Sequence, residues 1–223
     1  NQLNILPVNI FIQLTKLYGL RLHHNKITSL LNGTFHGLLE LRILNLNTNM
    51  VSFLESAVFE PLTSLQKLYM SFNKLSLLPT YLFHSLGNLT YLNLERNEIS
   101  EVSYETFIGL KNVPALYLKG NSIKVMSLSF FRNMRRLDLL NVQQNQLTTI
   151  TDYFCERHSS DFNASNGNDD NPTTLELPVD LRFDNNHISQ IHAGAFAFDI
   201  RQIFLQNNRL TGLPNYVFSH SPN

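Results

Sequence analysis

Hydrophobic and polar residues recur along this chain with a period of 24 residues. One position of the period holds an asparagine, and a phenylalanine follows ten residues later. The asparagines are Asn25, Asn49, Asn73, Asn97, Asn121 and Asn145, and the phenylalanines are Phe35, Phe59, Phe83, Phe107 and Phe131. The next equivalents are Asn186 and Asn208, with Phe196 and Phe218. One repeat therefore contains an insertion, and the repeat after it is short by two residues.

Around each asparagine the residues follow the pattern LxxLxLxxNxLxxL, as in Leu65 to Leu78. The alternation of Leu68 with Met70, and of Leu92 with Leu94, is typical of a short β-strand with one buried face. A single unit cannot cover its own apolar side chains, so neighbouring units must stack, and each buried leucine then contributes about 1.5–3 kcal/mol. The pattern predicts a solenoid with a parallel sheet along one side.

The repeated asparagine and phenylalanine have different predicted roles. Where the chain leaves a strand it turns inward, and its backbone N–H and C=O groups become buried between coils. An asparagine amide offers two donors and an acceptor, so we expect it to satisfy these groups. Its loss should cost about 1–3 kcal/mol. The phenylalanines are expected to stack as an apolar spine under the opposite, convex wall.

The full motif LxxLxLxxNxLxxLPxxxFxxL is nearly complete in residues 65–86, with Pro79 and Phe83. In this motif the chain resembles the leucine-rich repeat family, in the 24-residue form of animal cell-surface receptor ectodomains and secreted matrix proteins. The resemblance implies an α/β solenoid, a right-handed curved superhelix with a concave parallel β-sheet and a mostly irregular or short-helical convex side. It also implies that the concave face binds other proteins.

The resemblance covers the chain as a single leucine-rich repeat domain, residues 1–223. A half repeat spans 1–16, repeats begin at 17, 41, 65, 89, 113, 137, 178 and 200, and a polar insertion covers about 156–177. Family ectodomains usually close with cysteine-rich caps, whereas Cys155 is the one cysteine here. We therefore expect an excised or incomplete segment without terminal caps.

Strand alternation identifies the side chains that face outward. Because leucines point inward at the fourth and sixth positions of a repeat, the third, fifth and seventh positions point out. Tyrosines at these positions give a large contact area at low entropic cost. The predicted protein-binding residues of the concave face are Tyr69, Tyr91, Asn93, Glu95, Tyr117, Lys119, Asn141 and Gln143. The alternative is that aromatic residues simply suit strands; Phe72 either extends this patch or packs against the next coil.

Composition narrows the classes of function. Lysine plus arginine and aspartate plus glutamate both number 17, so the net charge is zero, and neither nucleic acid nor a membrane surface is an expected partner. No apolar run is long enough to span a bilayer. Three N-glycosylation sequons occur, at Asn32, Asn88 and Asn163. About four are expected by chance, so their number does not indicate secretion.

The residues that could act in catalysis or bind a metal ion do not have the spacing of a known catalytic or metal-binding motif. Cys155 and His158 provide two zinc ligands where four are needed. The insertion lacks the glycine and glutamate of an EF-hand loop, so a surface loop is the preferred interpretation. Cys155 is interpreted as a buried residue in the phenylalanine slot, with a thiol that pairs outside this segment or senses redox state as the alternative. No enzyme activity, cofactor or metal ion is predicted.

These observations predict a non-catalytic recognition module, part of a cell-surface receptor ectodomain or secreted protein, that binds a protein ligand on its concave face. The expected location is extracellular or at the cell surface. The alternative is a cytoplasmic leucine-rich repeat scaffold or inhibitor that assembles protein partners. No oligomeric state is predicted.

Overall fold

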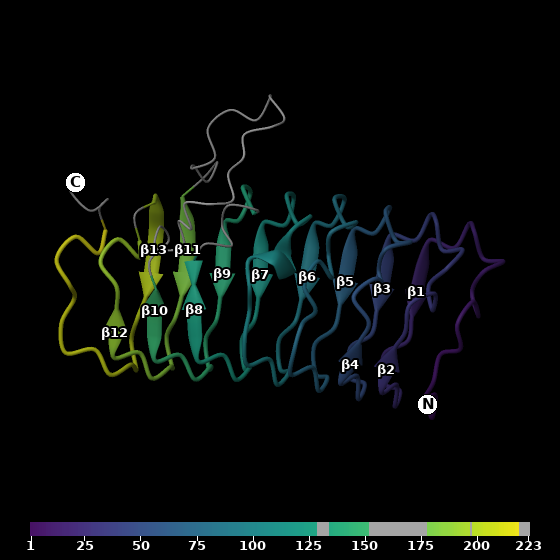
Figure 1. Cartoon of the computed structure of the whole chain (residues 1–223), viewed down its shortest axis with the longest axis horizontal. Coiled ribbons are helices and arrows are strands. Elements are labelled where there is room, and N and C mark those ends of the chain that lie inside the picture. Colours follow the sequence, from purple (N-terminus) through teal and green to yellow (C-terminus); the bar gives the residue numbers. More distant parts are fainter. Residues whose placement is uncertain (129–133, 152–177, 197, 219–223) are drawn as a thin grey trace.

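The computed structural model describes residues 1–128, 134–151, 178–196 and 198–218, which form a solenoid of stacked coils (Figure 1). Each coil adds one strand to an eight-stranded parallel sheet, here called the main sheet, whose order follows the sequence. Its strands are β1 (Gly19–Arg21), β3 (Ile43–Asn45), β5 (Lys67–Tyr69), β6 (Tyr91–Asn93), β7 (Ala115–Tyr117), β9 (Leu139–Asn141), β11 (Val179–Arg182) and β13 (Ile200–Phe204). The predicted leucine-rich repeat solenoid is confirmed.

Two smaller parallel sheets lie along the opposite edge of the coils (Figure 1). One contains β2 (Ser29–Leu30) and β4 (Phe53–Leu54); the other contains β8 (Val125–Ser127), β10 (Thr149–Thr151) and β12 (Gln190–Ile191). Helix content is small, and η1 (Glu105–Phe107) is a single 3-10 turn. The sequence pattern did not predict these short sheets.

The main sheet buries one of its faces completely in its middle strands. Leu44, Leu68, Leu92 and Leu116 stand opposite one another in register, and each is 0% exposed. Stacking leucine on leucine from coil to coil removes their apolar surface from water, at about 1.5–3 kcal/mol for each side chain. The inward direction predicted for the fourth position of the repeat is therefore observed.

The asparagine ladder satisfies buried backbone groups, as predicted. The Nδ2 of Asn97 donates to the carbonyl of Leu94 at 3.1 Å and to that of Met70 in the preceding coil at 2.9 Å. Its Oδ1 accepts the N–H of Leu75 at 3.1 Å. The same bonds within and between coils are made by Asn49, Asn73, Asn121, Asn145, Asn186 and Asn208.

The phenylalanine spine is also observed. Consecutive rings from Phe11 to Phe107 lie 6.0–6.3 Å apart and are nearly parallel. Phe196 and Phe218 stack in the same way at 5.7 Å. Phe131, Cys155 and the predicted insertion lie outside the described residues.

The eighth position of each repeat has a left-handed backbone that the sequence pattern did not reveal. Positive φ angles occur at His24, Thr48, Phe72, Arg96, Gly120, Gln144, Asn185 and Asn207. This conformation aims the N–H at the next coil, so that Phe72 donates to the carbonyl of Glu95 at 3.0 Å and Arg96 to that of Lys119 at 2.9 Å. Glycine and asparagine tolerate such angles, whereas bulky and β-branched residues are strained by them.

Candidate functional site

The outward side chains of the main sheet form continuous rows. Register pairs place one residue from each strand side by side: Arg21, Asn45, Tyr69, Asn93, Tyr117, Asn141, Arg182 and Phe204. Tyr91 lies in a neighbouring row and pairs with Lys67. Strands β5, β6 and β7 therefore bring three tyrosines together on one surface.

We call Tyr69, Tyr91 and Tyr117 the tyrosine cluster. The ring centroids of Tyr69 and Tyr91 are 4.8 Å apart, and those of Tyr91 and Tyr117 are 5.8 Å apart. Both distances lie in the favourable range for aromatic pairs, at about 0.5–1.5 kcal/mol each. All three side chains are half-buried. The rings support one another and still leave part of their surface to solvent, so the cluster is held in place before any partner arrives.

Asparagines beside the cluster are bonded within the protein. The Nδ2 of Asn93 donates to the Tyr91 hydroxyl at 3.4 Å, and its Oδ1 accepts the N–H of Glu95 at 2.8 Å. Asn141 accepts the N–H of Gln143 in the same way at 3.2 Å and is only 7% exposed. Side-chain bonds to the backbone two residues later are typical of asparagine. The sequence analysis did not predict these bonds, although an asparagine at the end of a strand could have indicated them.

The remaining predicted residues differ in how available they are. Gln143 donates from Nε2 to the buried carboxylate of Asp184 at 2.8 Å. Glu95 and Lys119 follow the ends of the neighbouring strands β6 and β7, and neither has an ion pair with any described residue. The structure therefore leaves the tyrosines, Glu95 and Lys119 as the accessible members of the predicted set, whereas Asn93, Asn141 and Gln143 shape the surface.

The environment of Tyr117 alters its acidity. Burial raises the pKa of the Tyr117 hydroxyl above 10.0, and the nearby Tyr91 and Glu95 raise this pKa further, while Arg182 lowers it. Charge on the phenolate would be poorly solvated and close to a carboxylate. Tyr117 therefore remains a neutral hydrogen-bond donor throughout the physiological pH range.

The sequons differ in their surroundings. Asn32 and Asn88 are both exposed. The amide nitrogen of Asn88 donates to the carbonyl of Thr63 at 2.9 Å, and Asn112, one repeat later and outside any sequon, makes the equivalent bond to Gly87 at 2.8 Å. A structural role therefore accounts for an asparagine at position 88. Asn163 lies outside the described residues.

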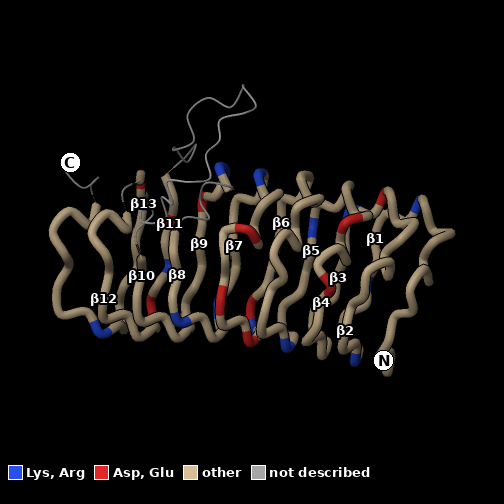
Figure 2. The backbone as a smooth tube through the Cα atoms, viewed as in Figure 1, with Lys and Arg blue, Asp and Glu red and all other residues tan. Residues whose placement is uncertain are grey.

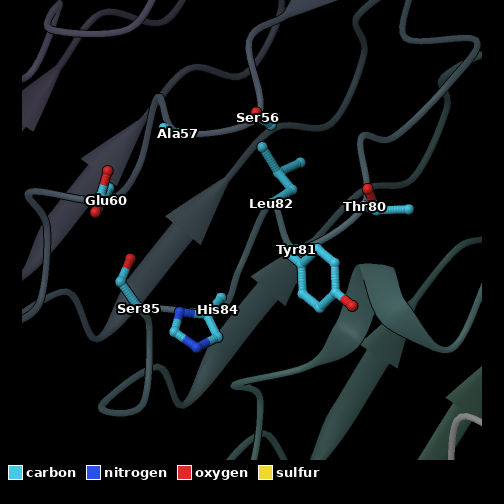
Figure 3. A pocket seen from close by; sticks show the side chains of 8 residues that line it. All are labelled: Ser56, Ala57, Glu60, Thr80, Tyr81, Leu82, His84 and Ser85. Carbon is cyan, nitrogen blue, oxygen red and sulfur yellow. The ribbon is translucent and has the colours of Figure 1, made fainter.

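A pocket of about 420 Å³ lies between two coils, and no residue of the tyrosine cluster lines it (Figure 3). Its lining residues are Ser56, Ala57, Glu60, Thr80, Tyr81, Leu82, His84 and Ser85. Ser85 donates from its hydroxyl to the carbonyl of Phe59 at 3.3 Å. The Ser85 hydroxyl is therefore paired with backbone and not with His84, which is not the arrangement of an activated nucleophile at Ser85.

Charged side chains are spread over the solenoid. Figure 2 shows acidic and basic residues interspersed along the coils, without one continuous basic stripe over the part of the chain that is described. In that same part, no three histidine, cysteine, aspartate or glutamate side chains gather in a way that could hold a metal ion. None of its helices is long and apolar enough to cross a membrane. Cys155 and His158 lie outside it.

Comparison with known proteins shows what the chain is similar to. Residues 15–75 and 71–123 match the family model described as leucine rich repeat. No curated protein matches the chain in sequence. Several solved structures share the fold over most of its length.

One similar structure is the complex of TLR13 with ssRNA13, at 25% identity and a TM-score of 0.76, with 94% of this chain and 28% of that chain covered. A second is a leucine-rich repeat protein of Leptospira interrogans, at 22% identity and a TM-score of 0.68, with 95% and 48% covered. A third is the glycosylated Toll–Spatzle complex of Drosophila, at 22% identity and a TM-score of 0.63, with 84% and 24% covered. The chain thus spans less than half of each of these structures.

Proposed function

We propose that this chain, which belongs to the leucine-rich repeat family, is a non-catalytic protein-recognition module of a receptor-type protein, and that it binds its partner through the tyrosine cluster on the main sheet. The observation that carries the proposal is the contact between three half-buried rings on adjacent strands, at 4.8 and 5.8 Å. The similarity to TLR13 and Toll supports a receptor-type role.

Physical reasons favour these tyrosines as the centre of an interface. Tyrosine has few rotatable bonds, so ordering it on binding costs little entropy, and its ring provides apolar area beside a hydroxyl donor. Residues that dominate binding energy tend to cluster at the middle of an interface, surrounded by polar groups. Glu95 and Lys119 provide such a polar margin at the ends of β6 and β7.

The binding role is tested by replacing all three tyrosines with alanine. The wild-type chain serves as bait to capture a protein partner from its native source, and affinity is then measured by surface plasmon resonance. We expect the triple variant to bind about 100-fold more weakly, since each anchor ring contributes about 1 kcal/mol or more. Circular dichroism checks that the variant remains folded.

The chain offers a matched control for this experiment. Tyr18, Tyr81 and Tyr216 are more exposed than the cluster, at 57%, 54% and 58%, and lie outside the main sheet. Replacing these three tyrosines with alanine removes the same number of rings and should leave the affinity unchanged. Equal losses in the two triple variants, or no loss in the cluster variant, would remove the tyrosine cluster as the binding surface.

We also propose that the protein is located outside the cell or at its surface. N-glycosylation at Asn32, which is an exposed sequon, would be consistent with this location. Mass spectrometry of native material before and after enzymatic deglycosylation tests this location. A glycan at Asn32 supports it. Unmodified Asn32 and Asn88 would favour an intracellular scaffold that assembles protein partners.

A further inference from the structure

Phe72 presents an exposed aromatic ring at the eighth position of its repeat. It follows strand β5 with φ 55° and leaves 54% of its side chain exposed. All the equivalent residues share this backbone: Gly120, Asn185 and Asn207 adopt it with little strain, whereas His24, Thr48, Arg96 and Gln144 bear it as Phe72 does. A bulky aromatic residue with positive φ is uncommon, and the exposed ring gains little from burial. The repeat therefore accounts for the backbone of this position, whereas the exposure of the aromatic ring sets Phe72 apart.

Phe72 holds the side chain of the equivalent residue in the next coil. The guanidinium carbon of Arg96 lies 5.7 Å from the centre of the Phe72 ring. A guanidinium that stacks on a ring keeps its N–H donors directed outward, and these donors match the two oxygens of a carboxylate. Arg96 is exposed and has no ion pair with any residue in the described ranges.

Two lysines stand beside the same surface. The N–H of Arg96 donates to the carbonyl of Lys119 at 2.9 Å, which places these residues on adjacent coils, and Lys67 pairs in register with Tyr91. Neither lysine has an ion pair within the described part of the chain. With Glu95 as the neighbouring acid, the strands and turns that carry the tyrosine cluster hold three cations, Lys67, Arg96 and Lys119, and Arg182 acts on Tyr117 from farther along the sheet. The surface thus has an unneutralised positive excess in a chain whose net charge is zero.

Resting on the proposed function, we infer that the partner presents a carboxylate-bearing segment to this surface. An aspartate or glutamate of the partner binds Arg96 and Lys119, and an adjacent apolar side chain packs on Phe72 and the tyrosine cluster. A basic segment would meet three unpaired cations and would be repelled. A nucleic acid would need a longer basic track than these three side chains provide.

The inference is tested with peptides selected from a random phage-displayed library on the intact, folded chain. The selected peptides are synthesised with a fluorescent label, and their affinity is measured by fluorescence anisotropy at low and high salt. We expect them to carry aspartate or glutamate next to an aromatic or aliphatic residue. Arg96→Gln should weaken their binding about tenfold, because charge-assisted hydrogen bonds are lost.

The control for Arg96→Gln is Arg42→Gln. Arg42 stacks on Tyr18 with the same 5.7 Å separation, but it precedes strand β3, whereas Arg96 follows the end of strand β6. This variant removes an equivalent pair and should leave peptide affinity unchanged. Lys119→Gln should weaken the binding by a smaller factor than Arg96→Gln and should flatten its dependence on salt.

The possible results separate the two proposals. Acidic peptides that require both the tyrosine cluster and Arg96 support the inference. Peptides that require the tyrosine cluster but carry no acid, or that ignore Arg96→Gln, overturn the inference and leave the proposed function standing. A selection without any peptide that depends on the tyrosine cluster contradicts both. Displacement of acidic peptides by a single-stranded oligouridylate that binds more tightly overturns the inference in favour of nucleic acid.

Discussion

Two segments of the main sheet share their buried side and differ on their outward side. In the tyrosine segment, β5 to β7, aromatic rings contact one another beside charges that have no partner in the described residues. In the charged segment, β9 to β13, Arg201 contacts Asp138 at 2.7 Å and Asp180 at 2.9 Å. Arg182 stacks over Phe204 at 5.4 Å much as Arg96 stacks on Phe72 at 5.7 Å, so the two segments differ in their ion pairs and not in their cation–π contacts. The tyrosine segment leaves its charged side chains without ion pairs to described residues, whereas the charged segment pairs Arg201 with Asp138 and Asp180.

The ion pairs of the charged segment lie where the repeat is irregular. The repeat that begins at residue 178 is two residues shorter than the 24-residue period, and the register between β11 and β13 shifts between Val179 and Asp180. Hydrogen bonds from Arg201 to Asp180 and Asp138 raise the pKa of the guanidinium, so the proton is held more tightly within these contacts. A partner binding at the charged segment would have to break such contacts, whereas the tyrosine segment imposes no such cost.

The shared buried side is tested by removing one ring of the phenylalanine spine. Phe83 is 0% exposed, with Phe59 and Phe107 each 6.3 Å away. Phe83→Ala should lower the free energy of unfolding by about 3–5 kcal/mol, since it loses burial and leaves a cavity. Phe218 is 53% exposed, so Phe218→Ala should cost less than about 1 kcal/mol. Urea denaturation measures both, and equal costs would contradict a continuous spine.

The asparagine ladder allows a smaller and more local comparison. Asn97 is 7% exposed beneath the tyrosine segment, whereas Asn208 is half-buried beyond the charged segment. Asn97→Leu should cost about 2–3 kcal/mol because the N–H of Leu75 and the carbonyl of Met70 are left buried without partners. Asn208→Leu should cost about 1 kcal/mol or less, because water can reach its partners. A larger cost at Asn208, again from urea denaturation, would refute this explanation.

Substitutions at the eighth position of the repeat, at Phe72 and at Asn185, separate an effect on the free energy of unfolding from an effect on binding. Phe72→Asn should raise the free energy of unfolding by about 1 kcal/mol, because it relieves a bulky residue from positive φ. Asn185→Phe in the charged segment should lower that free energy by a similar amount. Thermal and urea denaturation provide the measurement. Phe72→Asn should also weaken partner binding, and a variant that is destabilised and binds normally would show that Phe72 serves folding.

Tyr117 gives the smallest predicted effect. Burial, followed by the fields of Tyr91 and Glu95, raises the pKa of Tyr117, so Glu95→Gln should lower this pKa and Arg182→Gln should raise it further. The folded chain holds this proton more tightly than the unfolded chain. The associated stability is therefore present below pH 10.0 and is lost as the pH rises through the folded pKa. Absorbance titration against Tyr117→Phe measures the shift, and no response to Glu95→Gln would contradict the assignment.

The sequence predicted the features that recur with the 24-residue period, and it missed the features that depend on the backbone angles and side-chain positions of single residues. Spacing alone located the strands of the main sheet, the inward leucines, the bonds of Asn97 and the stacking of Phe83, because each repeats in a similar environment. The left-handed backbone at Thr48 and Phe72 was missed, because only Gly120, Asn185 and Asn207 among the eighth-position residues are types that favour it. The stacking of Arg96 on Phe72 requires side-chain positions in two coils, which no repeat pattern contains.

The most direct test of the tyrosine cluster as the recognition surface is hydroxyl-radical footprinting of the chain, free and bound to its captured partner, read by mass spectrometry. Aromatic side chains across the whole main sheet are modified in the same experiment, so each segment controls for the other. The account predicts protection of Tyr69, Phe72, Tyr91 and Tyr117 on binding, with the modification of Phe204 unchanged. Protection of Phe204 while the three tyrosines stay as reactive as in the free chain would contradict it.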